Sequence, residues 1–441
     1  MRRLLPLLLL LCGFGSGHGL TLDAVLKRTA DSNPEITKAR IELERASGQR
    51  LVFRSIGLPD AVIGIVGGDE GGHRAGQKPN QPFGFAYGGM TQAFFNLAVP
   101  ASFRRGDLEV LIAQQRLNVA MMDQLHAARV AFYTAIYSHG LNQIRDDQRQ
   151  RLEQNIASQQ DRYQSGLATR GNLVGAEVQM RELDPQVEAS QRAYDGALVK
   201  LAEAMGEDIG PSALLPEPVG ELKYVAFNVD LQTEVTRTLE RRPDLELARL
   251  VVRAANEDQR IMEAAYYPIV NATVSGDYIP VSDVRRTQGT GSPQRSNDIV
   301  SSEIRAGGTY TWRVIDNGRT YGAVMRQRSA REINELLLHK LEGDVSRDMS
   351  RIQRNLQAIA SKHELLSKAD NSAMENASTV QENLTGGLVS QLDFRLAQNA
   401  ALEIRSGLLS LAYQENMARA EWDRATGRYF QFSVEPPQNV R

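Results

Sequence analysis

Most of the chain carries apolar residues at the alternating three- and four-residue spacing of amphipathic helices. These helical patterns cover residues 21–55, 107–163, 172–205, 230–265, 319–383 and 393–426. Inside residues 319–383 the spacing is that of a coiled-coil seam. The seam consists of Leu338, Leu341, Val345, Met349, Ile352, Leu356, Ile359, His363 and Leu366. At about 1.5 Å per residue the two longest helices reach roughly 90 to 100 Å, which is too long for a globular domain.

Two regions change from helical spacing to the alternation of apolar and polar residues that is typical of β-strands. They lie near residues 58–99 and 268–315, and each holds two strands joined by a link rich in Gly, Pro, Gln and Ser. The strands have the roughly 9 to 11 residues of a transmembrane β-strand. The alternative is an ordinary soluble hairpin in each region.

The most aromatic face of these strands falls in the stretch 83–99. Phe83, Phe85 and Tyr87 lie at alternate positions there and therefore share one face. We expect this face to continue the apolar, outward-pointing side of the sheet. Residues 61–67 are apolar on both faces and leave their own orientation open.

The chain contains an internal duplication. Pro34 and Pro243 are 209 positions apart, and so are Pro59 and Pro268. A shared spacing of this kind indicates one structural unit present twice. We therefore expect two repeats, at residues 20–215 and 216–430, followed by a disordered tail at residues 431–441.

Each repeat contains a turn between two long helices, at residues 166–177 and 387–398. In both turns a glycine, Gly166 or Gly387, stands three residues before a hydroxyl residue, Thr169 or Ser390. The glycine suits a left-handed helix end, and the hydroxyl can cap the amides of the next helix. The turns therefore predict two long antiparallel helical hairpins.

Four strands cannot close into a barrel, and an open sheet edge is not tolerated in lipid. Copies of the chain must then complete the sheet. Eight strands from a dimer would enclose only side chains, whereas twelve strands from a trimer leave room for a lumen.

The first residues have the order of a secretory signal peptide: Arg2 and Arg3, an apolar run, then small residues. We expect cleavage after residue 19, which leaves a mature chain without cysteine. Lipidation of Cys12 is an alternative. Loss of the two arginines leaves 49 basic against 53 acidic residues, a net charge of −4, which gives no electrostatic case for binding nucleic acid.

Residues for catalysis are missing from the sequence. The six histidines show no metal-ligand spacing with carboxylates, and the Gly-rich residues 67–72 lack the Lys-Ser/Thr of a phosphate-binding loop. We therefore expect neither an enzyme nor a bound metal or cofactor. No apolar run after the signal peptide approaches the roughly 18 to 20 residues of a transmembrane helix, so any membrane crossing would have to use strands.

The ordered motifs resemble the TolC-like outer-membrane efflux family. They are the two proline-broken helices, the prolines before the strands, the sequence Asp316-Asn317-Gly318-Arg319 after a strand, and the two turns. This resemblance implies a mainly α-helical homotrimer with a 12-stranded outer-membrane barrel and an α-barrel tunnel in the periplasm. It further implies an exit duct for small molecules, namely drugs, toxic compounds or metal ions, that works with a periplasmic adaptor and an inner-membrane transporter.

The resemblance also implies roles for individual residues. The turn residues at the periplasmic tip, where the adaptor would bind, are Gly166, Leu167, Thr169, Gly387, Leu388 and Ser390. Asp393 matches a position where an acidic ring narrows the tunnel as a gate. The sequence departs from the family pattern at Leu396, where a second acidic residue is usual.

Two other functions fit the same sequence features. One is an exit duct for polypeptides in type I secretion. The other is a periplasmic coiled-coil scaffold without a pore, in which the alternating segments are ordinary hairpins.

Overall fold

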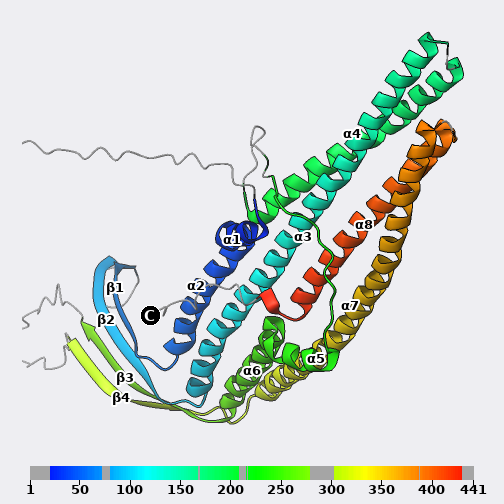
Figure 1. The fold of residues 1–441 in the computed structure, drawn as a ribbon. Coiled ribbons are helices and arrows are strands. Elements are labelled where there is room, and N and C mark those ends of the chain that lie inside the picture. The colour runs from blue at the N-terminus through cyan, green and yellow to red at the C-terminus, as the bar shows by residue number, and fades with distance from the viewer. Residues whose placement is uncertain are drawn as a thin grey trace, which may run out of the picture. The chain divides into compact units, whose positions relative to one another are not determined.

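The computed structural model describes residues 20–71, 80–166, 169–207, 215, 217–278, 302–386 and 388–429. The elements in chain order are α1 (Leu22–Ser32), α2 (Pro34–Ser55), β1 (Asp60–Gly71), β2 (Asn80–Phe95), α3 (Ala98–Gln164), α4 (Arg170–Met205), α5 (Leu231–Arg241), α6 (Pro243–Glu263), the 3₁₀ helix η1 (Ala264–Tyr266), β3 (Ile269–Tyr278), β4 (Ser302–Thr311), α7 (Arg319–Thr385) and α8 (Gln391–Ala425) (Figure 1). The predicted signal peptide and tail lie outside the described residues.

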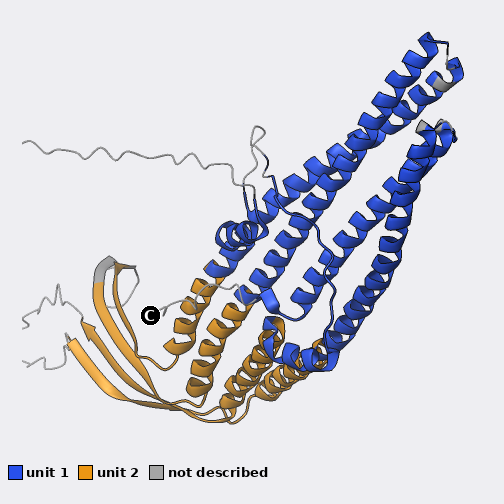
Figure 2. Ribbon diagram, in the orientation of Figure 1, with its two compact units in different colours: residues 1–40, 117–243, 342–438 blue, residues 41–116, 244–341, 439–441 orange. Residues whose placement is uncertain are grey.

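The predicted fold class, long helices with two pairs of antiparallel strands, is confirmed. Every predicted helix end agrees with the structure to within two residues, except the start of α3. The two sequence repeats stay a prediction. In space the chain groups into two compact units, each taking residues from both repeats: unit 1, residues 1–40, 117–243 and 342–438, and unit 2, residues 41–116, 244–341 and 439–441 (Figure 2).

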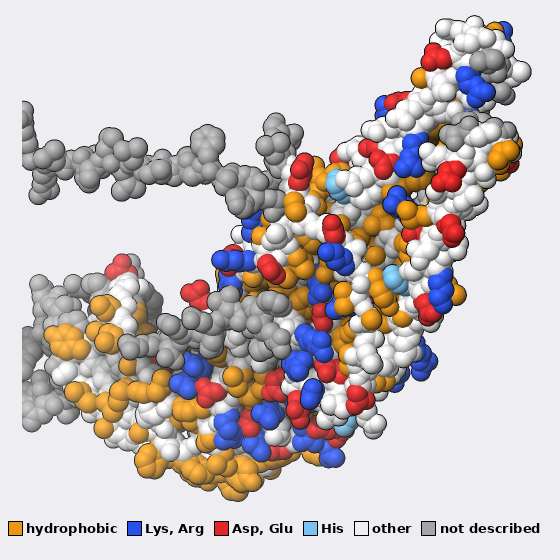
Figure 3. Space-filling model, viewed as in Figure 1, with side chains coloured by type: hydrophobic (Ala, Val, Ile, Leu, Met, Phe, Trp, Pro, Cys, Tyr) orange, Lys and Arg blue, Asp and Glu red, His pale blue; other side chains and the backbone are white. Residues whose placement is uncertain are grey.

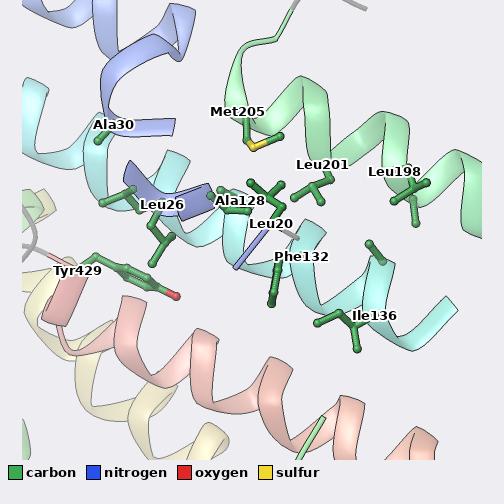
Figure 4. Close-up of a cluster of buried hydrophobic side chains, with 14 of the residues drawn as sticks. Leu20, Leu26, Ala30, Ala128, Phe132, Ile136, Leu198, Leu201, Met205 and Tyr429 are labelled. Atoms are coloured by element: carbon green, nitrogen blue, oxygen red, sulfur yellow. The ribbon is translucent and has the colours of Figure 1, made fainter. Parts of the chain in front are cut away.

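Unit 1 is stabilised by a buried apolar cluster from α1, α3, α4 and the residues that follow α8 (Figure 4). Leu125 and Leu201 are fully enclosed, and the ring of Tyr429 lies beside Leu26. Full burial of a leucine side chain contributes about 1.5–3 kcal/mol to the free energy of unfolding.

The seam predicted on α7 is buried in the part that belongs to unit 1. Val345, Met349, Ile352, Leu356 and Ile359 are all buried. This part of the predicted seam is confirmed. The buried residues form the side of α7 that packs in unit 1.

Two helix breaks in unit 1 are built alike. Asn33 ends α1 because Pro34 follows it, and the Asn33 amide side chain donates to the carbonyl of Ala204 at 3.0 Å. Gly206, which caps α4 with a φ of 75°, packs against this break. In the second half Gly427, with a φ of 69°, packs in the same way against Arg242, which precedes Pro243.

Unit 2 contains a single antiparallel sheet in the order β1-β2-β3-β4. The register across one row pairs Gly64 with Tyr87, Tyr87 with Asp277, and Asp277 with Glu303. A bulge between Ala93 and Phe95 shifts the register of β2 by one residue near its end. Because paired residues share a face, the register assigns every side chain in the sheet to one of two faces.

One face of the sheet, the apolar face, is almost free of polar side chains. It consists of Ala61, Ile63, Ile65, Gly67, Asp69, Gly84, Ala86, Gly88, Met90, Gln92, Phe95, Val270, Ala272, Val274, Gly276, Tyr278, Ser302, Ile304, Ala306, Gly308 and Tyr310. Its charged residue, Asp69, lies near the end of β1. The Gln92 amide donates to the carbonyl of Gly57 at 2.8 Å, so this polar group is satisfied. Figure 3 shows hydrophobic side chains gathered over the strands.

The opposite face, the polar face, carries Asp60, Thr91, Asn271, Thr273, Ser275, Asp277, Glu303, Arg305, Thr309 and Thr311. Phe85 and Tyr87 lie on this same face. The expectation that the aromatic face of β2 continues the apolar face is therefore wrong. The ambiguous segment 61–67 is resolved, because Ile63 and Ile65 pair with residues of the apolar face.

The junction from β2 to α3 also differs from the sequence prediction. β2 ends at Phe95, because the Asn96 side chain accepts a hydrogen bond from the amide of Ala98 at 2.9 Å and starts the helix. Gly106 does not interrupt α3. A Cβ at this position would lie 2.9 Å from the Cβ of Phe53, so the glycine permits close packing of α2 on α3.

Candidate functional site

The two predicted turns lie at the same end of unit 1, one joining α3 to α4 and the other joining α7 to α8 (Figure 1). In the first turn Gly166 has the expected left-handed backbone, with a φ of 72°. Thr169 is extended and precedes α4, but its side chain makes no capping hydrogen bond, so the expected cap is wrong here. Leu167 lies outside the described residues.

The second turn is capped completely. The Ser390 hydroxyl oxygen accepts a hydrogen bond from the amide of Asp393 at 3.2 Å, and the Asp393 carboxylate accepts from the Ser390 amide at 3.1 Å. This reciprocal pair is a capping box, which confirms the predicted role of Ser390. The amide of Leu388 donates to the carbonyl of Asn383 at 2.8 Å and closes the end of α7. Gly387 lies outside the described residues.

Asp393, the predicted gate residue, is exposed and is already hydrogen-bonded within its own helix turn. The Ser390 hydroxyl donates to Asp393 Oδ2 at 2.6 Å. This side-chain hydrogen bond, followed by the one from the Ser390 amide, lowers the pKa of Asp393 below its ordinary value. The carboxylate therefore stays charged at pH values where an ordinary aspartic acid begins to protonate.

An exposed apolar stripe begins at the second turn and runs along α8. Leu388, Leu392 and Leu396 are four residues apart and are 78%, 62% and 59% exposed. Leu392 and Leu396 lie on one side of α8, and Leu388 precedes the helix in the turn. Leu388 was predicted at the tip, and Leu396 stood out in the sequence only as a departure from the family pattern. The i, i+4 spacing of Leu392 and Leu396 was the available signal for the helical part of the stripe.

A groove with a volume of about 560 Å³ lies between the two hairpins of unit 1, near the turns. Its lining is dominated by amide and guanidinium side chains, including Gln148, Arg151, Gln179, Gln381, Arg395 and Gln398. Arg395 Nη1 donates to Gln179 Oε1 at 3.4 Å and connects α8 to α4. The groove and the stripe together give this end of unit 1 a polar and an apolar surface.

The sheet is the second candidate site. β1 and β4 form its two edges, and neither edge is paired with another strand in the described residues. An apolar face with two open edges is unfavourable in water, and natural proteins usually cover such edges. The sheet therefore has the surface of an element that is completed by lipid and by further strands.

Within the ranges that the structure covers, no helix is both long and apolar enough to span a membrane. The same ranges contain no group of three or more His, Cys, Asp and Glu side chains placed to hold a metal ion.

The comparisons with known proteins agree with this architecture. Residues 235–428 match the outer membrane efflux protein family. A search of curated proteins finds no match.

Solved structures match over nearly the whole chain. The outer membrane protein VceC of Vibrio cholerae is 16% identical, with 92% of this chain and 96% of that chain covered and a TM-score of 0.75. The CmeC outer membrane channel of Campylobacter jejuni is 13% identical, with coverages of 92% and 85% and a TM-score of 0.78. The MtrE outer membrane channel of Neisseria gonorrhoeae is 15% identical, with coverages of 92% and 88% and a TM-score of 0.69.

The chain thus has the fold of the matched outer membrane channels. Residues 235–428 match the outer membrane efflux protein family, and the chain as a whole has the TolC-like fold, as the motifs predicted. The matched family is one of efflux proteins, and the CmeC and MtrE structures are those of outer membrane channels.

Proposed function

We propose that the protein is the outer-membrane duct of a tripartite efflux system. In this proposal it lets small molecules, such as drugs, toxic compounds or metal ions, pass from the periplasm to the exterior. The observation that carries the proposal is the sheet of unit 2, with one apolar face and two unpaired edges. The family match and the channel folds of the neighbours support it.

The sheet suggests the assembly. Three copies would pair β4 of one chain with β1 of the next and close twelve strands, which is wide enough for a lumen. The apolar face would contact lipid and the polar face would line the lumen, as in other barrels of outer membranes. The helices of each chain would extend this duct into the periplasm.

The test is a conductance measurement on the detergent-purified protein in a planar bilayer, with the oligomer size determined on the same sample. We expect stable channel steps from a particle of trimer size. A monomer without channel steps, recovered in the soluble periplasmic fraction, would contradict the duct and favour the scaffold.

The turns would form the periplasmic tip that meets the adaptor, and the transporter would act through this contact. Gly166 and Thr169 in one turn, and Leu388 and Ser390 in the other, are the described residues of that surface. We extend it to Leu392, because the exposed stripe continues from Leu388 along α8. Apolar side chains exposed in a row usually mark a protein contact.

Cysteine crosslinking tests the adaptor contact. The predicted mature chain contains no cysteine, so Leu388→Cys introduces a single thiol at the turn. We expect it to crosslink to the helical hairpin of a co-expressed adaptor, because the side chain is 78% exposed. Leu337→Cys is the matched control: Leu337 is 57% exposed on α7 but belongs to unit 2, and it should give no crosslink. Equal crosslinking at both positions, or none at Leu388, would remove the contact.

Asp393 would act as the tunnel gate, and its lowered pKa gives a testable pH dependence. We expect Asp393→Asn to reduce the cation selectivity of the pore. In the wild type, the contribution of Asp393 to selectivity should persist as the pH falls past the ordinary pKa of aspartic acid, because the Ser390 hydrogen bonds favour the charged form.

Removal of the hydroxyl tests this cause directly. Ser390→Ala should raise the pKa of Asp393, so that its contribution to selectivity is lost at a higher pH than in the wild type. Ser390→Thr keeps the hydroxyl and is the control. Identical selectivity-against-pH curves for the alanine variant and the wild type would show that the capping box does not set the charge at the gate.

A further inference from the structure

The polar face of the sheet carries an aromatic pair that is unusual for a surface facing water. Phe85 and Tyr87 are two residues apart on β2, with ring centroids 6.1 Å apart and ring planes tilted by 44°. Tyr87 is 40% exposed. The cross-strand register places both rings on the same face as the charged residues of β3 and β4.

The Tyr87 ring lies over Gly64 on the neighbouring strand β1. Gly64 is the cross-strand partner of Tyr87, and a Cβ at Gly64 would overlap the Tyr87 ring. The glycine therefore provides the space in which the ring lies. The ring therefore leans toward β1 and away from β3.

An acidic side chain lies on the same face, on the strand at the other side of Tyr87. Asp277 pairs directly with Tyr87 across the strands, which places their Cα atoms roughly 4.5–5.5 Å apart. Glu303 is next in the same row, but Arg305 neutralises it through a two-pronged ion pair with distances of 2.7 and 2.5 Å. Asp277 makes no ion pair among the described residues, although Arg305 is within electrostatic reach.

An exposed aromatic ring and a carboxylate on the same face of a sheet have a definite chemical preference. The ring face attracts cations through its quadrupole, and the carboxylate adds a negative charge at the same level. Apolar anions gain the ring contact but are repelled by the carboxylate. The ligand class that satisfies both groups is an aromatic or strongly apolar organic cation.

We propose that Phe85, Tyr87 and Asp277 form a contact site for aromatic organic cations on the lumen side of the sheet. This inference rests on the proposed duct, in which the polar face lines the lumen. A homotrimer would carry three such sites at one level of the barrel. Cargo of this class would then pause at the sites during exit.

Single-channel recording with two dyes tests the site. Ethidium is the aromatic cation, and fluorescein is an aromatic anion of similar size. We expect ethidium to interrupt the wild-type current with a measurable dwell time and fluorescein to produce no comparable interruptions. Tyr87→Ser should shorten the ethidium dwell time about two- to fivefold, Asp277→Asn should shorten it too, and Tyr87→Phe should preserve it.

Tyr278→Ser is the matched control. Tyr278 is also an exposed tyrosine and adjoins Asp277, but it lies on the apolar face. Variants are compared only where their channel steps match those of the wild type, which shows that they are folded. Normal steps with equal dwell times in Tyr87→Ser and Tyr278→Ser, or equal interruption by fluorescein, would overturn the contact site alone. Absence of channel steps from the wild type would overturn the duct and the contact site with it.

Discussion

Val274→Arg should prevent stable insertion of the protein into the outer membrane, whereas Thr273→Arg should leave insertion intact. The two residues are neighbours near the middle of β3 and therefore lie at the same depth, but Val274 belongs to the apolar face and Thr273 to the polar face. An arginine that faces lipid at the bilayer midplane costs about 2–4 kcal/mol. In the proposed trimer, three such arginines would raise the cost of insertion to roughly 6–12 kcal/mol.

The measurement is the amount of protein that remains in the outer-membrane fraction after a urea wash, followed by conductance of the purified variants. Thr273→Arg should remain in that fraction and form channels of altered selectivity, because a charge has been added to the lumen. Retention of Val274→Arg together with loss of Thr273→Arg would mean that the two faces are assigned the wrong way round.

Gly206→Ala should lower the stability of unit 1 by about 2–5 kcal/mol. A left-handed backbone at a residue other than glycine costs about 1–2 kcal/mol, and overpacking by the new methyl group adds about 1–3 kcal/mol. The new Cβ would lie 2.7 Å from the carbonyl oxygen of Ser32 and 2.9 Å from the Cα of Asn33. Both are backbone atoms, so no side-chain rotation relieves the overlap. The midpoint of thermal loss of helical circular dichroism, measured in detergent, reports the effect.

Gly427→Ala is the matched control from the other half of the chain. Gly427 has nearly the same backbone conformation, but its nearest contact, the Cα of Arg242, is 3.4 Å from the position of an added Cβ. The substitution should therefore cost only the backbone term, about 1–2 kcal/mol. A midpoint for Gly427→Ala at or below that of Gly206→Ala would show that packing at the α1–α2 break contributes little.

The helices could be predicted from sequence because their signals are local. Pro34 and Pro243 fix the two breaks, and the α7 seam has a clear spacing. The start of α3 could not be predicted, since Pro100 and Gly106 usually argue against a helix interior. Pro100 is tolerated because it lies in the first turn, where its missing amide has no partner.

The faces of the sheet could not be predicted from β2 alone. Phe85 and Tyr87 give β2 an aromatic face, and the alternation within one strand does not show which neighbours share it. The polarity of the face comes from Asp277 and Arg305, nearly 200 residues or more further along the chain. The bulge between Ala93 and Phe95 also moves the residues that follow it to the opposite face of the sheet. Nothing in the sequence marks this change, so an alternation read from Phe83 to Val99 assigns its last residues to the wrong face.

The candidate site at the turns was predicted in part. Gly166 and Ser390 follow from the chemistry of helix ends, which depends on one or two residues. Thr169 has the right side chain and an extended backbone, yet its hydroxyl accepts no capping hydrogen bond, so side-chain type and position do not determine a cap by themselves. The second turn has a complete capping box, in which the third helical residue, Asp393, also reaches back.

The two open edges of the sheet have a consequence for the life of the chain before assembly. β1 and β4 extend over 12 and 10 residues and present unpaired backbone groups beside an exposed apolar face. Such edges pair with any available strand, including those of unrelated nascent chains. In the proposed trimer, an unassembled protomer would thus be a substrate for aggregation and for periplasmic quality control, and the yield of mature protein should depend on how soon three chains meet.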